Sequence, residues 1–437
     1  MTLVRWTGAV SALSVADRRA LLDRSQSSDD VVRHRTSDII ARVRAGGDAA
    51  LRALAVELDG VSLASLEVPR HVCAAALEAL TPDLRRVMQR AATNIRRVHE
   101  AFRPIAQETE SEPGIVVGRR PDALGRVGVY APGGRAAYPS SVLMGVIPAR
   151  VAGVGEIIVC SPPVRGSGQP SAVVLAAAAL AGADRVFALG GAGAIAALAY
   201  GTESVPRVDC VVGPGNAYVA EAKIQVSSSV AIDSPAGPSE LLVLADDSAD
   251  VRFVAREVLA QAEHDPMAAV VVVATSAPVA RAVGEAIASL LPSQPRADVA
   301  LEALAGQGAV LYADSLDDAV QFANAYAAEH LLLVVGDTEN ILDRIRNAGT
   351  IFVGPHASVA FGDYMTGANH VLPTGGLARS HSGLSTLDFV RWTTYQRISS
   401  AAAARLSQDV GVFADAEGLG GHALAARAFA EAVHGRE

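Results

Sequence analysis

The sequence is poor in cysteine, in aromatic residues and in excess positive charge. Its three cysteines, Cys73, Cys160 and Cys210, form no CxxC motif and no even framework, so they offer neither a thiolate metal cluster nor a disulfide scaffold. The formal net charge is −9 and no basic block occurs, which argues against a nucleic-acid partner. No apolar run reaches the ~20 residues that span a bilayer, and the N-terminal MTLVRWTGAV does not resemble a signal peptide. We therefore expect a cytoplasmic protein without a membrane or nucleic-acid partner.

The residues that are abundant favour a layered α/β protein. Of the 437 residues 50% are apolar, and only 4% are aromatic, while glycine and alanine are common. Small residues allow helices to lie close on a parallel sheet. A chain of this length has room for roughly two or three domains and a large buried core.

Strand-like and helical segments alternate in two stretches, which favours two parallel sheets. Helical spacing of apolar residues predominates in residues 8–105 and again after about residue 385. The strand signals lie at 127–130, 156–160, 185–189 and 210–212 in the first stretch, and at 241–244, 270–273, 309–312, 331–335 and 350–353 in the second. We expect one α/β layer structure from each stretch.

Three glycine-rich loops follow strands of the first stretch. Gly191-x-Gly193-x-x-Ala196 fits a loose dinucleotide fingerprint, and Gly213-Pro214-Gly215-Asn216 opens the next helix. Asp209 has about the spacing of a ribose-binding acid but precedes its strand. The loop from Tyr130 to Ser141 could cover a cofactor. Each loop alone could also be an ordinary turn, but two on neighbouring strand ends favour a nucleotide.

Polar side chains in the second stretch offer candidates for catalysis and metal binding. Gln261 and His264 lie three residues apart at the end of an amphipathic helix, which makes half of a metal site that other oxygen or nitrogen donors would complete. Glu329-His330 precedes a strand, where a histidine base and a carboxylate can act together, although a surface pair is the alternative. Further candidates lie in glycine-rich segments, namely Asp363, His370, Glu417 and His422.

Taken in order, these segments resemble the histidinol dehydrogenase family. The resemblance covers the chain from about residue 125 to its end, while the helical N-terminal third carries no motif. The matching segments are YAPGGRAAYPSSVLM (130–144), GAIAALAYGTESVPRVD (193–209), GPGNAYVAEAK (213–223), IDSPAGPSE (232–240), QAEHD (261–265), NAYAAEHL (324–331), FGDYMTGANHVLPT (361–374) and AEGLGGH (416–422).

The resemblance implies two incomplete Rossmann-like α/β/α domains plus helical N- and C-terminal segments. The implied division has four parts: an N-terminal helical segment (1–25), a first α/β domain with most zinc and catalytic residues (26–126 with 240–384), a second α/β domain on the NAD side (127–239), and a C-terminal helical segment that reaches the partner subunit (385–437).

The family resemblance also implies a zinc- and NAD-dependent four-electron oxidation of L-histidinol to L-histidine through histidinal, the last steps of histidine biosynthesis. His330 would accept the alcohol proton, and Glu329 would help to activate the water that attacks the aldehyde. One zinc ion per subunit would be bound by Gln261, His264, Asp363 and His422. The residues that contact the substrate would be Ser239, Gln261, His264, His330, Asp363, His370, Glu417 and His422.

By the same likeness, Tyr130, Gly193 and Asn216 would contact NAD. The family usually has a glutamine where this chain has Gly193, so we expect weaker or altered contact with NAD. Family members are homodimers with intertwined subunits, in which Glu417 and His422 would serve the active site of the other subunit.

Two alternatives stay open at this point. The segment Trp392-Thr393-Thr394-Tyr395-Gln396 is similar to a sister branch that resembles sulfopropanediol dehydrogenase, so the substrate could be another small polar alcohol. A nucleotide-binding protein that has lost catalysis is the second alternative, and the presence of Glu329, His330 and all four ligand positions argues against it.

Overall fold

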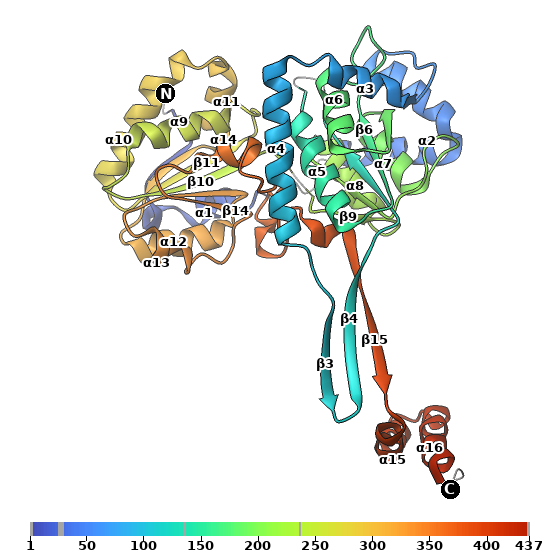
Figure 1. Ribbon diagram of the computed structural model, residues 1–437. Helices are drawn as coiled ribbons and strands as arrows, with labels where there is room; N and C mark the ends of the chain where they lie inside the picture. The colour runs from blue at the N-terminus through green and yellow to red at the C-terminus, as the bar shows by residue number, and fades with distance from the viewer. Residues whose placement is uncertain (1–2, 25–29, 134–136, 236, 435–437) are drawn as a thin grey trace. The chain divides into compact units, whose positions relative to one another are not determined.

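The computed structural model describes residues 3–24, 30–133, 137–235 and 237–434. The chain divides into two compact units, one of Met1–Phe102 with Leu124–Phe389 and the other of Arg103–Ala123 with Val390–Glu437. The first unit contains two six-stranded sheets, and the second contains a three-stranded sheet and two helices (Figure 1).

The first sheet is parallel throughout and buried on both faces. Its strand order is β1-β12-β11-β10-β13-β14, with bounds Trp6–Ala9, Ala309–Tyr312, Ala269–Ala274, Glu240–Ala245, His330–Val334 and Thr350–Val353. Alternate strand residues enter two separate cores. Leu241 and Val243 pack with α9 (Val251–Ala262), α10 (Ala277–Leu290) and α11 (Ala297–Gln307). Leu242 and Leu244 pack with α1 (Val15–Leu22), α12 (Leu316–Tyr326) and α13 (Thr338–Leu342). Burial on both faces explains why these strands are continuous apolar runs.

The second sheet has the order β2-β7-β6-β5-β8-β9 and is parallel except at β2. Its strands are Glu67–Val68, Arg185–Ala188, Glu156–Ser161, Arg126–Tyr130, Cys210–Val212 and Ala231–Ile232. The helices that follow them are α5 (Pro139–Ala152), α6 (Ala172–Ala181), α7 (Gly191–Tyr200) and α8 (Ala217–Val226). The strands predicted from the two alternating stretches are therefore confirmed, and so is the α/β fold class.

The helices of the N-terminal third pack on helices that follow strands of the second sheet, whereas the resemblance groups residues 26–126 with 240–384. In this part, α2 (Asp30–Leu54) packs on α7 and α8, α3 (Arg70–Glu78) on α6, and α4 (Pro82–Ala101) on α5. The short π-helix Ala55–Asp59 follows α2. Helical periodicity shows which face of a helix is buried but does not identify the sheet that the helix covers.

Both terminal segments contain strands that helical spacing did not reveal. Within residues 1–25, β1 pairs with β12 at the edge of the first sheet. Within residues 385–437, β15 (Val390–Ile398) pairs with β4 (Ile115–Ala123), which also pairs with β3 (Gln107–Glu112). Helices α15 (Ser400–Ala416) and α16 (Gly420–His434) follow β15. Within the described residues, every helix is too short or too polar to span a bilayer.

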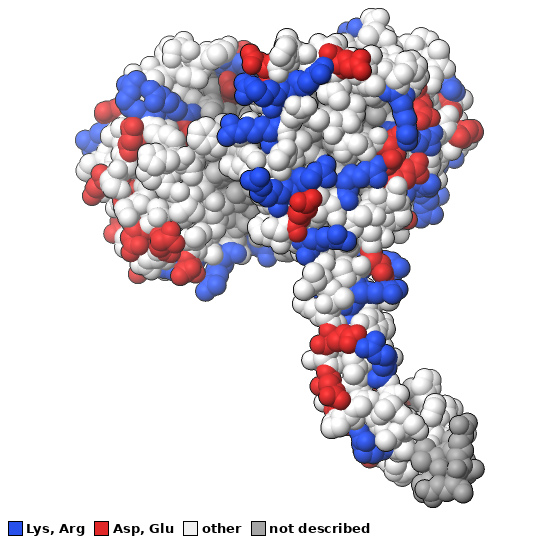
Figure 2. Space-filling model, viewed as in Figure 1, with Lys and Arg blue, Asp and Glu red and all other residues white. Residues whose placement is uncertain are grey.

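Helix α4 is amphipathic and has an arginine-rich outer face. Met88, Ala91, Ile95 and His99 are its buried residues. Its exposed arginines are Arg86, Arg90, Arg96 and Arg97, and Figure 2 shows basic side chains gathered where α4 runs in Figure 1. The 3.6-residue period thus separates the polar face from the core-facing face, as expected for a helix that covers a layer.

His99 is expected to make the stability of the fold depend on pH. Its side chain is 3% exposed, and neither ring nitrogen has a hydrogen-bond partner in the described part of the chain. Burial lowers the pKa of His99 to about 4. The unfolded chain, with a histidine pKa of about 6.5, therefore binds more protons between these values, and folding stability falls as the pH falls through this window.

Between pH 7 and pH 5 the protonation of His99 in the unfolded chain lowers the free energy of unfolding by about 2 kcal/mol. Urea unfolding at the two pH values measures it. A His99→Leu variant should lose about that much less stability on acidification than the unmodified chain, whereas replacement of the exposed His71 by leucine should not change the difference. Equal losses for the unmodified chain and His99→Leu would contradict the assignment.

Candidate active site

Glu329 is the last residue of the turn after α12, and His330 is the first residue of β13. Helix α12 ends at Tyr326, and Ala327, with φ 53°, is the single non-glycine residue of the described ranges with a positive φ. Strand β13 begins at His330, which pairs in register with Leu241 of β10. The pair therefore lies beside Glu240 at the end of the first sheet where its parallel strands begin, and both side chains are buried.

The hydrogen bonding of His330 fixes its tautomer. Nδ1 lies 2.9 Å from the backbone oxygen of Glu240, which can only accept, so Nδ1 carries the proton and donates. Nε2 has no hydrogen-bond partner within the described residues and lies 3.7 Å from Asp363 Oδ1. A neutral His330 therefore presents an unshared lone pair on Nε2, as a general base requires.

Glu329 is held by the same strand. Its Oε2 accepts from the backbone nitrogen of Glu240 at 2.7 Å and lies 3.4 Å from His330 Nδ1. Burial raises the pKa of Glu329 to about 8. Burial also lowers the pKa of His330, but Glu329 and Asp363 raise it, and the net pKa is about 9. Because the charge of each group affects the pKa of the other, Glu329 and His330 titrate as a coupled pair.

Asp363 is positioned by a contact between two helices. Glu257 of α9 accepts from the backbone nitrogen of Val359 at 2.9 Å, at the start of α14 (Val359–Tyr364). Asp363 lies one turn later on α14, and its backbone oxygen accepts from His370 Nδ1 at 2.9 Å. Burial raises the pKa of Asp363, but His330, His370 and His264 outweigh burial and lower it. These four side chains therefore lie close enough to interact electrostatically.

Gln261 and His264 come from the end of α9. Gln261 is 2% exposed, and its Nε2 has no partner among the described residues. His264 is exposed, yet partial desolvation by the surrounding protein lowers its pKa, and the charge of Asp363 opposes this shift. A carboxamide, a neutral imidazole and an ionised carboxylate are donors that suit a borderline cation such as zinc. The described residues contain no complete group of three His, Cys, Asp or Glu around one point.

The other predicted substrate and metal residues are distributed over both units. His370 Nε2 lies 3.5 Å from Ser141 Oγ on α5, and Ser239 immediately precedes Glu240. Glu417 and His422 belong to the second unit, where both are exposed. The first unit by itself thus supplies three of the four predicted metal ligands.

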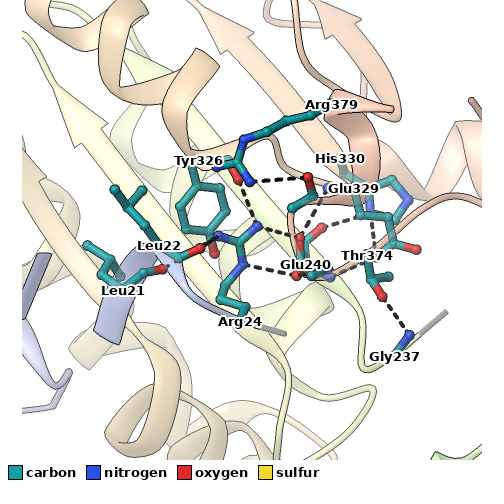
Figure 3. A network of polar contacts seen from close by, with 12 residues as sticks. Leu21, Leu22, Arg24, Gly237, Glu240, Tyr326, Glu329, His330, Thr374 and Arg379 are labelled. Carbon is teal, nitrogen blue, oxygen red and sulfur yellow. Dashed lines mark hydrogen bonds and ion pairs between the residues drawn. The ribbon is translucent and has the colours of Figure 1, made fainter. Parts of the chain in front are cut away.

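A buried ion pair supports the strand that holds Glu329 and His330 (Figure 3). Arg24 Nε and Nη2 each donate to the Glu240 carboxylate at 2.9 Å, and the guanidinium stacks 3.4 Å above the Tyr326 ring. Glu240 also accepts from the backbone nitrogens of Gly375 at 2.7 Å and Glu329 at 3.3 Å. No local pattern in the sequence indicated Arg24 or Glu240, because their partners are more than 200 residues apart.

A pocket of about 1220 Å³ lies at the carboxyl edge of the second sheet. Residues at the ends of β5, β6, β7 and β8 line it, including Tyr130, Ser161, Gly191 and Asn216. The chain runs from β5 to β7 on one side and returns through β8 on the other, so the pocket lies at a topological switch point. The Glu329–His330 pair is not among its lining residues.

The predicted cofactor residues differ in their relation to this pocket. Tyr130 Oη accepts from the Gly191 nitrogen at 3.1 Å, and Asn216 caps α8 by accepting from Tyr218 and Val219. Gly193 instead lines a separate cavity of about 20 Å³. Residues 134–136 of the loop after Tyr130, and Ala236 of segment 232–240, lie outside the described residues.

Two close contacts shape the loop that carries Asn216. Gly213 has φ 114°, and a Cβ there would collide with the backbone oxygen of Tyr130, so only glycine fits. The buried Lys223 pairs with Asp233 and donates to the Gly213 oxygen at 3.1 Å. The loop is thus fixed from both sides.

Asp209 does not contribute to the pocket, which corrects the ribose-binding candidate. Its Oδ2 accepts from the backbone nitrogen of Arg126 at 2.9 Å, at the start of β5 and hence at the opposite edge of the sheet. The pocket's acidic side chains come instead from the helical N-terminal third, namely Asp38, Glu57 and Asp59. Sequence reasoning missed them because that third was assigned to the other sheet.

Known proteins match this chain over nearly its whole length. The family model for histidinol dehydrogenase matches residues 22–429. A histidinol dehydrogenase of Methanosarcina barkeri is 46% identical over 96% of both chains, and one of Halobacterium salinarum is 50% identical over 93% of this chain and 95% of the relative. The crystal structure of histidinol dehydrogenase from Elizabethkingia anophelis superposes with a TM-score of 0.94 at 31% identity, covering 99% of both chains. The chain therefore belongs to the histidinol dehydrogenase family of oxidoreductases.

Proposed function

We propose that the protein catalyses the NAD-dependent four-electron oxidation of L-histidinol to L-histidine through histidinal. The observation that carries this proposal is the buried Glu329–His330 pair, in which Nδ1 of the histidine is protonated and Nε2 is unpaired. Because the relatives are named histidinol dehydrogenases, they favour histidinol over sulfopropanediol as the substrate. An intact base and carboxylate also argue against a protein that only binds nucleotide.

His330 and Glu329 take different roles in the two oxidations. His330 Nε2 accepts the proton of the substrate hydroxyl, while the Glu240 carbonyl keeps the ring oriented through Nδ1. Burial raises the pKa of Glu329 to about 8, so its carboxyl can take up and release a proton near neutral pH. It can therefore help to activate the water that attacks the aldehyde. NAD, when bound, accepts the electrons of each oxidation.

Gln261, His264 and Asp363 would hold zinc together with a fourth ligand. Zinc would supply a fixed point of attachment for the substrate amine and imidazole, without changing its redox state. His370, Ser239 and Glu417 would contact the substrate.

The fourth ligand would come from a second copy of the chain. Glu417 and His422 lie in the second unit, whose helices α15 and α16 leave large apolar side chains exposed. Phe413 is 70% exposed and Leu424 is 72% exposed, which is unusual for a surface without a partner. A homodimer would cover such side chains and place His422 of the partner subunit at the zinc.

Product identification tests the proposed reaction. The protein, supplied with zinc and NAD, should convert L-histidinol to L-histidine, while sulfopropanediol should give no turnover. Turnover of sulfopropanediol without turnover of L-histidinol would assign the chain to the other alcohol.

Removal of a proposed ligand tests the zinc site without an activity assay. Asp363→Asn is expected to weaken zinc binding by more than about tenfold, since even the loss of a residue that only orients a metal ligand costs about that much. Metal content after dialysis measures it. Replacement of Asp337, the N-cap of α13, should leave the metal content near one ion per subunit. Full zinc occupancy in Asp363→Asn would refute the assignment.

Gly193→Gln is expected to lower the KM for NAD about two- to tenfold, because one added hydrogen bond between the glutamine and NAD would strengthen binding by about that factor. A Cβ at position 193 would lie 3.5 Å from Leu54 and 3.6 Å from Leu51, which are ordinary contact distances, so the first atom of a side chain is accommodated there. Gly193→Ala adds only the methyl group and should leave the KM unchanged. If Gly193→Gln also leaves it unchanged, the idea that Gly193 weakens the contact with NAD is wrong.

A further inference from the structure

The strand end that usually carries the ribose-binding acid has no carboxylate in this chain. In dinucleotide-binding sheets, the acid follows the second strand of the unit, about 20 residues after the glycine loop. After the Gly191–Gly193 loop that strand is β8, and the acid beside it, Asp209, lies at the opposite edge of the sheet. The strand β6 ends at Ser161 and continues as Pro162-Pro163, all three of which line the pocket. A carboxylate that binds ribose must therefore come from another element.

Three acidic residues of the N-terminal third line the pocket, and their environments differ. Glu57 is already paired with Arg42 at 2.9 Å, and Asp38 is exposed on α2. Asp59 is partly buried, and its carboxylate accepts no hydrogen bond from any described residue. Its backbone oxygen accepts from Arg165 Nε at 3.1 Å, which fixes the chain at this point.

Asp59 also lies next to the glycine loop. It lines both the large pocket and the small cavity, and Gly190 lines both as well. Burial is the main cause of the raised pKa of Tyr130, and the charge of Asp59 adds to it. The Tyr130 hydroxyl accepts from the Gly191 nitrogen at 3.1 Å. The carboxylate thus lies near the N-terminus of α7, beside the pocket in which the dinucleotide would bind.

We propose that Asp59 binds the adenosine ribose hydroxyls of NAD and selects NAD against NADP. This inference rests on the proposed function, in that the pocket holds a dinucleotide. A carboxylate accepts hydrogen bonds from the two ribose hydroxyls, whereas the 2′-phosphate of NADP places like charges together. Arg35 and Arg165 also line the pocket, and their positive charges complement the pyrophosphate.

The experiment compares the two dinucleotides on unmodified protein, Asp59→Asn, Asp59→Ser and Asp83→Asn. Asp59→Asn should raise the KM for NAD about tenfold, because hydrogen bonds to a charged group are lost, with kcat nearly unchanged. The preference for NAD over NADP, as the ratio of kcat/KM values, should fall more than about tenfold. Asp59→Ser should show the same shift, and Asp83→Asn, at an exposed position of α4 outside the pocket, should behave as the unmodified protein.

Calorimetric binding of NAD and NADP, without substrate, separates this inference from the proposed reaction. A changed NAD-to-NADP binding ratio in Asp59→Asn would support Asp59 even if L-histidinol were not oxidised. An unchanged ratio in both Asp59 variants would overturn the role of Asp59 while leaving the reaction intact. Binding of neither dinucleotide by unmodified protein would overturn both.

Discussion

Replacement of His330 by asparagine is expected to lower kcat for L-histidinol oxidation by about 10²- to 10⁴-fold, the usual contribution of a general base. An asparagine amide can still donate towards the Glu240 carbonyl, so the local fold should persist, but it offers no basic lone pair in place of Nε2. Steady-state kinetics with L-histidinol and with histidinal would locate the loss. The step that removes the alcohol proton should suffer more than the oxidation of the aldehyde.

Glu329→Gln provides the complementary variant, because the role of Glu329 lies in activating water. Its larger defect should appear with histidinal. Replacement of the exposed His356 by asparagine is the matched control and should change neither step. A His330→Asn protein that keeps full turnover of L-histidinol would contradict the assignment of the base.

Arg24→Met is expected to destabilise the protein by about 3–5 kcal/mol, because it leaves the carboxylate of Glu240 buried without its partner. The side chains of Arg24 and Glu240 are only 6% and 4% exposed, so water cannot compensate. Since backbone atoms of Glu240 hold both Glu329 and His330, kcat should also fall at temperatures where the variant is still folded.

A double variant separates the charge effect from a general loss of packing. Arg24→Met combined with Glu240→Gln removes the unpaired charge, so it should be more stable than Arg24→Met alone. Arg86→Met breaks the exposed pair with Asp83 and should have little effect on urea unfolding. If Arg24→Met unfolded as the unmodified chain does, the ion pair would have no supporting role.

The sheets were predictable from sequence because parallel strands buried on both faces leave a strong pattern. Runs such as Val270–Val273 and Leu241–Leu244 are found where the sequence predicted them. Strand β1 was missed because Trp6–Ala9 is short and alternates weakly, and it is recognisable only through its pairing with β12. The contacts of α2, α3 and α4 with α5 to α8 were not predictable for the same reason, since local periodicity does not identify the partner of a helix.

The candidate site was predictable where family motifs carry it and not where support comes from distant segments. Glu329 and His330 belong to one motif, and both side chains form hydrogen bonds with backbone atoms of Glu240. Arg24 and Asp59 lie in the helical third without motifs, and only the fold brings them to Glu240 and to the pocket. Asp209 had a plausible spacing, but strand direction places it at the wrong edge of the sheet.

The most direct test of the account is the amount of NADH formed per L-histidinol consumed, followed to completion with zinc present. A four-electron oxidation requires two NADH for each L-histidine formed, with histidinal passing from the first step to the second. One NADH per histidinol, with histidinal accumulating, would contradict the role given to Glu329. No NADH from protein that binds both zinc and NAD would contradict L-histidinol as the substrate.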